Sequence, residues 1–147
     1  MSTRVRRAAA EDLERLRPLL AQLGYPAQEA AVAARLAALL HSDRDAVLVA
    51  EPREGAPGPL LGLISLHWGE MLHLAGPVAR IGSLVVEREA RGRGVGALLL
   101  REAQALARRR ACTLIEVTAG RDRHATHAFY AAQGFAWSSL RLHKVLD

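Results

Sequence analysis

A chain of 147 residues, half of them hydrophobic and 24% charged, is long enough to bury a core, and we expect one domain over residues 1–147. A single cysteine, Cys112, excludes an internal disulfide and a cysteine zinc site, and the N-terminus carries no apolar signal segment, so we expect a cytoplasmic protein without a membrane span. The net charge is +5, but the arginines are scattered, which argues against nucleic-acid binding and is compatible with attraction of a phosphorylated ligand.

The first part of the chain predicts a strand, two helices and a second strand. Residues 5–8 form the expected first strand. Leucines recur at helical spacing over 10–23, and Gly24 is expected to end that helix. The same spacing predicts a helix over 26–40, and the short apolar run 46–50 predicts a buried strand.

The second part alternates strands and helices after a turn rich in proline and glycine at 52–59. The expected elements are strands at 60–68 and 78–86, a helix at 94–110, a strand at 113–118, a helix at 123–133 closed by Gly134, and two strands within 135–145. The order β-αα-βββ-α-β-α-ββ describes a mixed α/β sheet with helices on both faces.

A glycine-rich turn joins the strand at 78–86 to the helix at 94–110. It reads Arg91-Gly92-Arg93-Gly94-Val95-Gly96. Glycines let backbone N–H groups approach a ligand without a Cβ in the way. The free N–H groups of the first helical turn and the helix dipole favour an anion, and the two arginines add positive charge. These properties predict a phosphate-binding site.

Several glycine motifs compete for this turn. A Walker loop needs Gly-Lys-Ser/Thr, which the segment lacks. The dinucleotide fingerprint is formally matched by Gly92, Gly94 and Ala97, but its first glycine should follow the strand directly, and too few residues remain for a doubly wound domain. A tight turn without a ligand stays as an alternative. The remaining motif, Arg/Gln-x-x-Gly-x-Gly/Ala, is met by Arg91, Gly94 and Gly96.

A second motif follows at 129–135, where the chain reads Phe-Tyr-x-x-x-Gly-Phe. The two motifs together resemble motifs A and B of the GNAT superfamily of N-acetyltransferases, and the resemblance is strong from Ile81 to Phe135. It implies the GNAT fold with a mostly antiparallel sheet, acetyl-CoA as cosubstrate, direct transfer of acetyl to a primary amine through a tetrahedral intermediate, and a homodimer.

The same resemblance implies the cosubstrate contacts. Backbone groups of Leu84 to Val86 would pair with the pantetheine arm like an added strand, and the Val86 N–H is the candidate that polarises the thioester carbonyl. Tyr130 would donate a proton to the leaving thiolate, with an aromatic that only packs as the alternative. The implied contacts are Leu84, Val85, Val86, Arg91, Gly92, Arg93, Gly94, Val95, Gly96, Arg123 and Tyr130. Arg123 stands where many relatives have Asn, and could reach a phosphate or the substrate.

The sequence does not decide which group takes the proton from the amine. Relatives often carry Glu near 82–83, where this chain has Gly82 and Ser83. Glu116 is the candidate catalytic base, with a solvent-facing strand residue as the alternative. The expected substrate contacts, of which the first three are also candidate bases, are His67, Glu70, His73 and His127. Two histidines and a glutamate could bind a metal, but three ligands without fixed geometry are weak evidence, and we expect none.

Further similarity concerns the acceptor. Gly-Leu-Ile-x-Leu-His at 62–67 and the histidine-containing run 123–130 are similar to aminoalkylphosphonate N-acetyltransferases, and other small-molecule acetyltransferases are also close. This implies a small primary amine with an anionic end. A non-catalytic acyl-CoA sensor and a protein acetyltransferase acting on N-termini or lysines stay open as alternatives.

Overall fold

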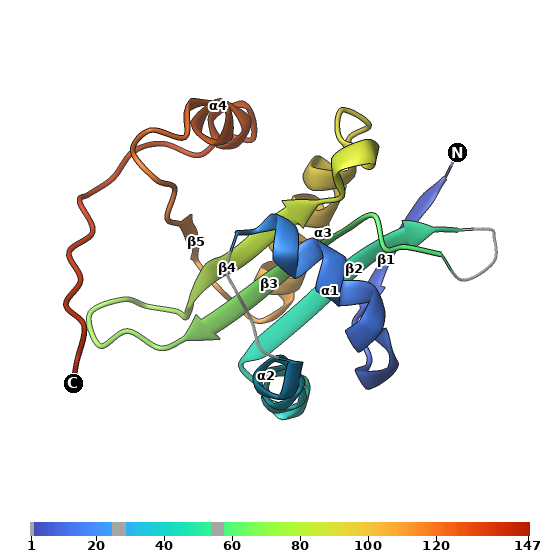
Figure 1. Ribbon diagram of the computed structural model, residues 1–147. Coiled ribbons are helices and arrows are strands. Elements are labelled where there is room, and N and C mark those ends of the chain that lie inside the picture. Colours follow the sequence, from blue (N-terminus) through green and yellow to red (C-terminus); the bar gives the residue numbers. More distant parts are fainter. Residues whose placement is uncertain (1, 25–28, 54–57) are drawn as a thin grey trace. The chain divides into compact units, whose positions relative to one another are not determined.

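The computed structural model describes residues 2–24, 29–53 and 58–147 (Figure 1). The chain divides into two compact units, Met1–Glu116 and Val117–Asp147, which are described in turn. The expected helix start at Pro26 and part of the expected turn at 52–59 lie outside the described residues. No helix in the described ranges is long and apolar enough to cross a lipid bilayer.

A five-stranded sheet forms the centre of the first unit. Its strands are β1 (Thr3–Arg7), β2 (Asp45–Pro52), β3 (Gly62–Gly69), β4 (Val78–Val86) and β5 (Leu114–Val117). They lie side by side in the order β1-β2-β3-β4-β5, and β1 to β4 pair antiparallel. The prediction of a mostly antiparallel sheet is therefore confirmed, and β4 has the bounds that its apolar run predicted.

Helices cover both faces of this sheet, as predicted. The helical segments are η1 (Ala10–Asp12), α1 (Leu13–Gln22), α2 (Glu29–His41), η2 (Arg88–Ala90) and α3 (Val95–Arg109). Figure 1 shows α1 and α2 in front of the sheet and α3 behind it. Because β2 is covered on both sides, all six of its inner residues, 46–51, are buried, whereas a strand with one solvated face would alternate.

Two apolar layers hold the helices on the sheet. On the side of α1 and α2, Leu19 and Val49 are fully buried with Leu63. On the other side, α3 buries Leu99 and Leu100, each of which stabilises the fold by about 2 kcal/mol. The α3 contact requires a glycine at residue 62, where an added Cβ would lie 2.9 Å from the Val85 carbonyl and 3.0 Å from Leu99 Cδ1. Gly62 thereby lets α3 pack closely on the start of β3.

The second unit is organised around α4 (His124–Ala132). Gly134 follows this helix with φ +90°, the left-handed residue that the sequence predicted as its stop. Tyr130 is buried, and its ring packs edge-on against Phe129 and Phe135 at 5.1 and 5.2 Å.

One prediction about this unit is wrong. Two strands were expected within 135–145, but residues 133–147 form neither helix nor strand. The alternation of Leu140 and Leu142 has the strand period, yet both side chains are exposed. A strand exists only when its N–H and C=O groups pair with a neighbour, and local periodicity cannot supply that neighbour. The alternation of apolar residues was therefore not enough to predict two strands within 135–145.

Candidate active site

The last residues of β4 form an edge that β5 leaves open. Thr113 N–H donates to Pro77 O at 3.1 Å, so β5 begins beside the start of β4, and its four residues are too few to follow all nine of β4. Glu87 N–H donates to Leu61 O at 2.8 Å on the β3 side. By the alternation of an antiparallel ladder, the Val85 N–H also faces β3, and the N–H groups of Leu84 and Val86 face the open side.

The three expected backbone contacts, Leu84, Val85 and Val86, do not all face the open edge. Val85 is buried in the core and paired with β3, so it supports the strand. Leu84 and Val86 are half-buried and present backbone N–H groups along the open edge. Such an edge accepts an extended chain by strand-like pairing.

The loop after β4 is fixed by a residue that sequence reasoning missed. Gln22, the last residue of α1, donates from Nε2 to a Glu87 carboxylate oxygen at 3.2 Å and accepts the Arg88 N–H at 3.0 Å. The Glu89 N–H donates to Glu87 at 2.6 Å, and this bond is the main reason that the pKa of Glu87 lies below its usual range. The 3-10 turn η2 is thus tied to α1, a contact that no local motif signals.

The glycine turn has the backbone conformation that an anion site needs. Gly92 and Gly94 have φ values of +80° and +82°, and a Cβ added at either would meet no atom within 4 Å. Gly94 is the N-cap of α3 without a side-chain cap, and the first turn contains no acidic residue. The N–H groups of the first helical turn have no partner within the helix and lie at the positive end of its dipole, next to exposed glycines.

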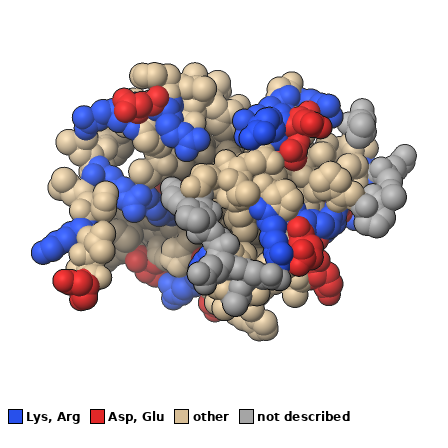
Figure 2. All heavy atoms as spheres, viewed as in Figure 1, with Lys and Arg blue, Asp and Glu red and all other residues tan. Residues whose placement is uncertain are grey.

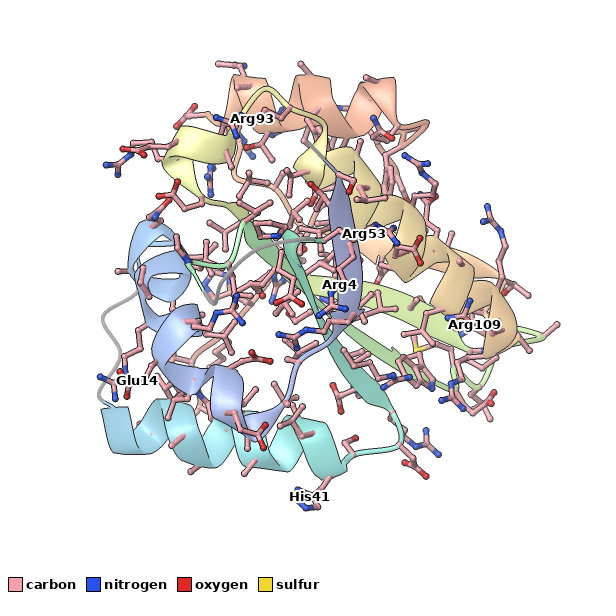
Figure 3. All side chains as sticks on the ribbon, turned by 90° about the vertical axis from the view of Figure 1, so that its right-hand side faces the viewer. Arg4, Glu14, His41, Arg53, Arg93 and Arg109 are labelled. Carbon is pink, nitrogen blue, oxygen red and sulfur yellow. The ribbon has the colours of Figure 1, made fainter. Side chains whose placement is uncertain are left out.

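Two arginines flank the turn, as the sequence predicted. Arg91 donates from Nε to the Val86 carbonyl at 3.1 Å, which places its guanidinium at the junction of strand and loop. Arg93 lies on the loop before α3, as Figure 3 shows, and both side chains are exposed. Of the remaining expected contacts, Val95 is buried under the turn and Gly96 follows it in the helix, so their backbone groups are the parts available to a ligand.

Polar side chains gather on the face of the sheet that also carries α1 and α2. The hydroxyls of Ser65 and Ser83 are 2.7 Å apart across β3 and β4, where the register shifts by a β-bulge. Gly82 is exposed beside them, and a Cβ there would lie 2.9 Å from Ser65 Oγ. The glycine that replaces the expected carboxylate thus leaves this hydroxyl pair uncovered.

Two ion-pairing contacts continue this polar face toward the other end of the strands. His67 Nδ1 lies 2.9 Å from Asp45 Oδ1, and Ser42 Oγ donates to the second oxygen of Asp45 at 2.7 Å. Glu116, the expected base, accepts from Arg80 at 3.2 Å and is half-exposed. Asp45 and Arg80 were not identified from the sequence, because only the strand register places them opposite His67.

The other expected substrate contacts of the first unit are in a loop and not on the strands. Glu70 and His73 are exposed in the loop between β3 and β4. Burial, followed by the Glu70 charge, raises the pKa of the Cys112 thiol, so Glu70 lies on the side of that cysteine. Across the described ranges, no three His, Cys, Asp or Glu side chains gather as they would around a metal ion.

The second unit holds Tyr130, Arg123 and His127. Burial raises the pKa of Tyr130 to about 12, partly offset by the positive charge of Arg123, so its hydroxyl stays protonated at neutral pH. His127 Nε2 donates to the Gly120 carbonyl at 2.6 Å, and its ring packs against Trp137 at 4.9 Å. Nε2 of His127 is therefore used in this hydrogen bond, and only Nδ1 would be available to a substrate.

The surface charge forms no continuous basic patch in the view of Figure 2, where basic side chains are interspersed with acidic ones. The net positive charge is thus distributed over that face, consistent with the scattered arginines of the sequence.

Comparison with known proteins identifies the family. Residues 10–135 match the Acetyltransferase (GNAT) family. The aminoalkylphosphonate N-acetyltransferase of Salmonella typhimurium is 36% identical over 89 residues, a match that spans 60% of this chain and 58% of that protein.

Solved structures share the fold. A putative acetyltransferase from Agrobacterium tumefaciens superposes with a TM-score of 0.82 at 28% identity, covering 97% of this chain and 99% of that one. The aminoglycoside N-acetyltransferase AAC(6')-Iy, in complex with the bisubstrate analogue CoA-S-monomethyl-acetylneamine, gives a TM-score of 0.86 at 19% identity, covering 100% and 99%. With a matched segment that contains both sequence motifs and the glycine turn at the start of α3, the chain belongs to the Acetyltransferase (GNAT) family.

Proposed function

We propose that this protein, acting as one domain over residues 1–147, transfers the acetyl group of acetyl-CoA to a primary amine of a small molecule. One observation carries the proposal: an uncapped helix N-terminus with two left-handed glycines follows, after the short turn η2, a strand edge with open N–H groups. An anion site next to an edge for an extended arm suits a ligand built as CoA is, with phosphates at one end and an amide-containing arm at the other.

In the proposed complex, the backbone of Gly92 to Gly96 and the cations Arg91 and Arg93 hold the pyrophosphate. The open edge at Leu84 and Val86 pairs with the arm, and an N–H there, with Val86 as the first candidate, polarises the thioester carbonyl. Arg123 supplies a further positive charge for a phosphate or the acceptor.

Tyr130 is proposed as the acid of the reaction. When the amine attacks the thioester carbon, the C–S bond breaks and the sulfur leaves as a thiolate, which needs a proton. A hydroxyl with a pKa of about 12 carries that proton at neutral pH. Glu116 stays a candidate base, although its carboxylate is paired with Arg80.

The acceptor is proposed to be a small primary amine with an anionic end. The support is the 36% identity to a protein named for aminoalkylphosphonates. Cationic or donor side chains of the first unit, including His67 and His73, and His127 of the second, would contact the acceptor, and Glu70 would contact its amine.

A homodimer is also proposed. Its support is the apolar surface of the C-terminal segment, where Trp137, Leu140, Leu142, Val145 and Leu146 are at least 75% exposed. Apolar groups concentrated in this way favour burial against a partner. Light scattering should give twice the mass of 15.9 kDa, and a monomeric mass would contradict the proposal.

The test is release of CoA thiol from acetyl-CoA with a panel of aminoalkylphosphonates, aminoglycosides, polyamines and amino acids. We expect turnover with the aminoalkylphosphonates and a loss of about 100-fold or more in kcat for Tyr130→Phe, with acetyl-CoA still raising the melting temperature. Wild-type turnover by Tyr130→Phe would refute the acid role. Thermal stabilisation without turnover on any amine would favour the sensor, and turnover only on peptides would favour a protein acetyltransferase.

A further inference from the structure

The turn η2 joins the two parts of the proposed cosubstrate site. It begins two residues after Val86, where the open edge of β4 ends, and it ends two residues before Gly92, the first left-handed glycine. A ligand that occupies both the edge and the glycine turn therefore depends on the conformation of η2. Because binding to a loop that is already ordered avoids the free-energy cost of ordering it, contacts that fix η2 raise the affinity.

The turn η2 has little stability of its own. A 3-10 segment of three residues is short, and its hydrogen bonds have poor geometry. The Ala90 N–H donates to the Glu87 carbonyl at 2.9 Å, but the Arg91 N–H reaches the Arg88 carbonyl at 3.4 Å, which is long. Ala90 is buried, whereas the side chains of Arg88 and Glu89 are exposed and anchor nothing in the core. The conformation of η2 therefore depends on contacts from outside the turn.

Such a contact comes from the side-chain amide of Gln22, at the end of α1. The Arg88 N–H is a donor and faces Oε1 at 3.0 Å, so the NH2 group of the amide faces the Glu87 carboxylate, at 3.2 Å. The second carboxylate oxygen of Glu87 accepts the Glu89 N–H at 2.6 Å, and the Glu87 N–H donates to the Leu61 carbonyl at 2.8 Å. The start of η2 is thus held from α1 and from the strand side at once, and each donor is matched to an acceptor.

We propose that Gln22 and Glu87 are positioning residues for the cosubstrate: their hydrogen bonds hold η2, and with it the glycine turn, in the conformation that binds acetyl-CoA. The inference rests on the proposed function. Neither side chain needs to touch the ligand, so the effect falls on the affinity for acetyl-CoA and not on the step that moves the acetyl group. When the pair is broken, the binding conformation is populated for a smaller fraction of the time, and the dissociation constant rises in proportion.

Exchanging the two side chains separates hydrogen bonding from charge. Gln22→Glu keeps an acceptor for the Arg88 N–H but sets two carboxylates against each other. Glu87→Gln uses its single oxygen for the Glu89 N–H, so its NH2 group faces the NH2 group of Gln22, two donors without an acceptor. The double variant Gln22→Glu/Glu87→Gln can form all three hydrogen bonds again and restores the net charge.

The experiment measures the dissociation constant of acetyl-CoA by titration calorimetry, after urea unfolding has shown that each variant is folded. Each single variant should raise the dissociation constant about 10-fold, from one lost hydrogen bond and a less ordered loop, and the double variant should return to within about 2-fold of wild type. Glu87→Gln is decisive, because removing a negative charge near an anion site would by itself tighten binding. With the best acceptor of the panel, KM for acetyl-CoA should rise in the single variants, while kcat and KM for the acceptor change less than about 2-fold.

Gln104→Glu is the matched control, because it makes the same change at a half-buried residue of α3, about 13 Å along the helix from Val95. It should bind acetyl-CoA as wild type does. Unchanged dissociation constants in both single variants, tighter binding by Glu87→Gln, or a double variant no better than the single ones would overturn the inference and leave the proposed function standing. Changed affinities without turnover on any amine would overturn the proposed function alone, and a wild type that does not bind acetyl-CoA would overturn both.

Discussion

Glu51 offers the sharpest test of how the first unit is held together. Its carboxylate, on β2, is 5% exposed and contacts three arginines: Arg4 at 2.6 Å, Arg6 at 2.9 Å and Arg15 at 3.2 Å. Arg6 also bonds the buried Asp12 at 2.8 Å, so β1, η1, α1 and β2 meet in one ionic network. We expect Glu51→Gln, which keeps the shape and removes the charge, to destabilise the fold.

The size of the expected loss of stability follows from the pKa of Glu51. Hydrogen bonds from Arg6, opposed by burial and helped by Arg4, lower it from 4.5 to about 2. A shift of that size corresponds to about 3 kcal/mol of stabilisation with the carboxylate ionised. Because the folded pKa is depressed, the stabilisation is complete above about pH 4.5 and is lost as the pH falls through about 2.

Urea unfolding at several pH values tests this account. Glu51→Gln should be about 3 kcal/mol less stable than wild type near pH 7, and the difference should shrink toward zero near pH 2. Glu14→Gln is the matched control, because Glu14 on α1 (labelled in Figure 3) is 72% exposed and pairs with its helix neighbour Arg17 at 3.1 Å. It should cost under about 1 kcal/mol. Equal losses in both variants, or a Glu51→Gln deficit independent of pH, would refute the reasoning.

Further predictions concern the glycines and the buried tyrosine. Gly94→Ala places a Cβ on a residue at φ +82° and should cost about 1 kcal/mol in urea unfolding and weaken stabilisation by acetyl-CoA; unchanged values in both measurements would contradict it. Gly62→Ala adds a Cβ 2.9 Å from the Val85 carbonyl and should cost about 1–3 kcal/mol, whereas a neutral change would show that the contact between β3 and α3 yields easily. In an alkaline absorbance titration, the difference between wild type and Tyr130→Phe should be one tyrosine ionising near pH 12; ionisation near its ordinary value would contradict the role of burial.

The parts of the fold that the sequence predicted are those with local causes. Gly24 and Gly134 end their helices at positive φ, as only glycine does without strain, and Gly94 begins α3 in the same way. The bounds of β4 were predicted correctly from its β-branched and aliphatic ends, Val78 and Val86. These features depend on the conformation and burial of neighbouring residues.

The same local information predicted the glycine turn that is proposed to bind an anion, but it did not identify the residues that would contact the acceptor. Arg91 and Gly94 are three residues apart in one loop, so their spacing is visible in the chain. The departure at Gly82 and Ser83 was also visible, but its consequence, a hydroxyl pair with Ser65, depends on the register of β3 against β4. For the same reason, the sequence suggested Glu116 as the catalytic base but not that its carboxylate would pair with Arg80.

What tertiary structure decided is the set of contacts between residues distant in the chain. Gln22 and Glu87 are 65 residues apart, Arg80 and Glu116 are 36 apart, and Asp45 and His67 are 22 apart. The sequence determined the helices, the five strands of the sheet and the glycine turn, but not the absence of strands within 135–145, because helical period, strand period and positive φ are properties of neighbouring residues and strand pairing is not. Register and helix docking decided which polar side chains meet, because a shift of one residue moves every side chain of a strand to the other face.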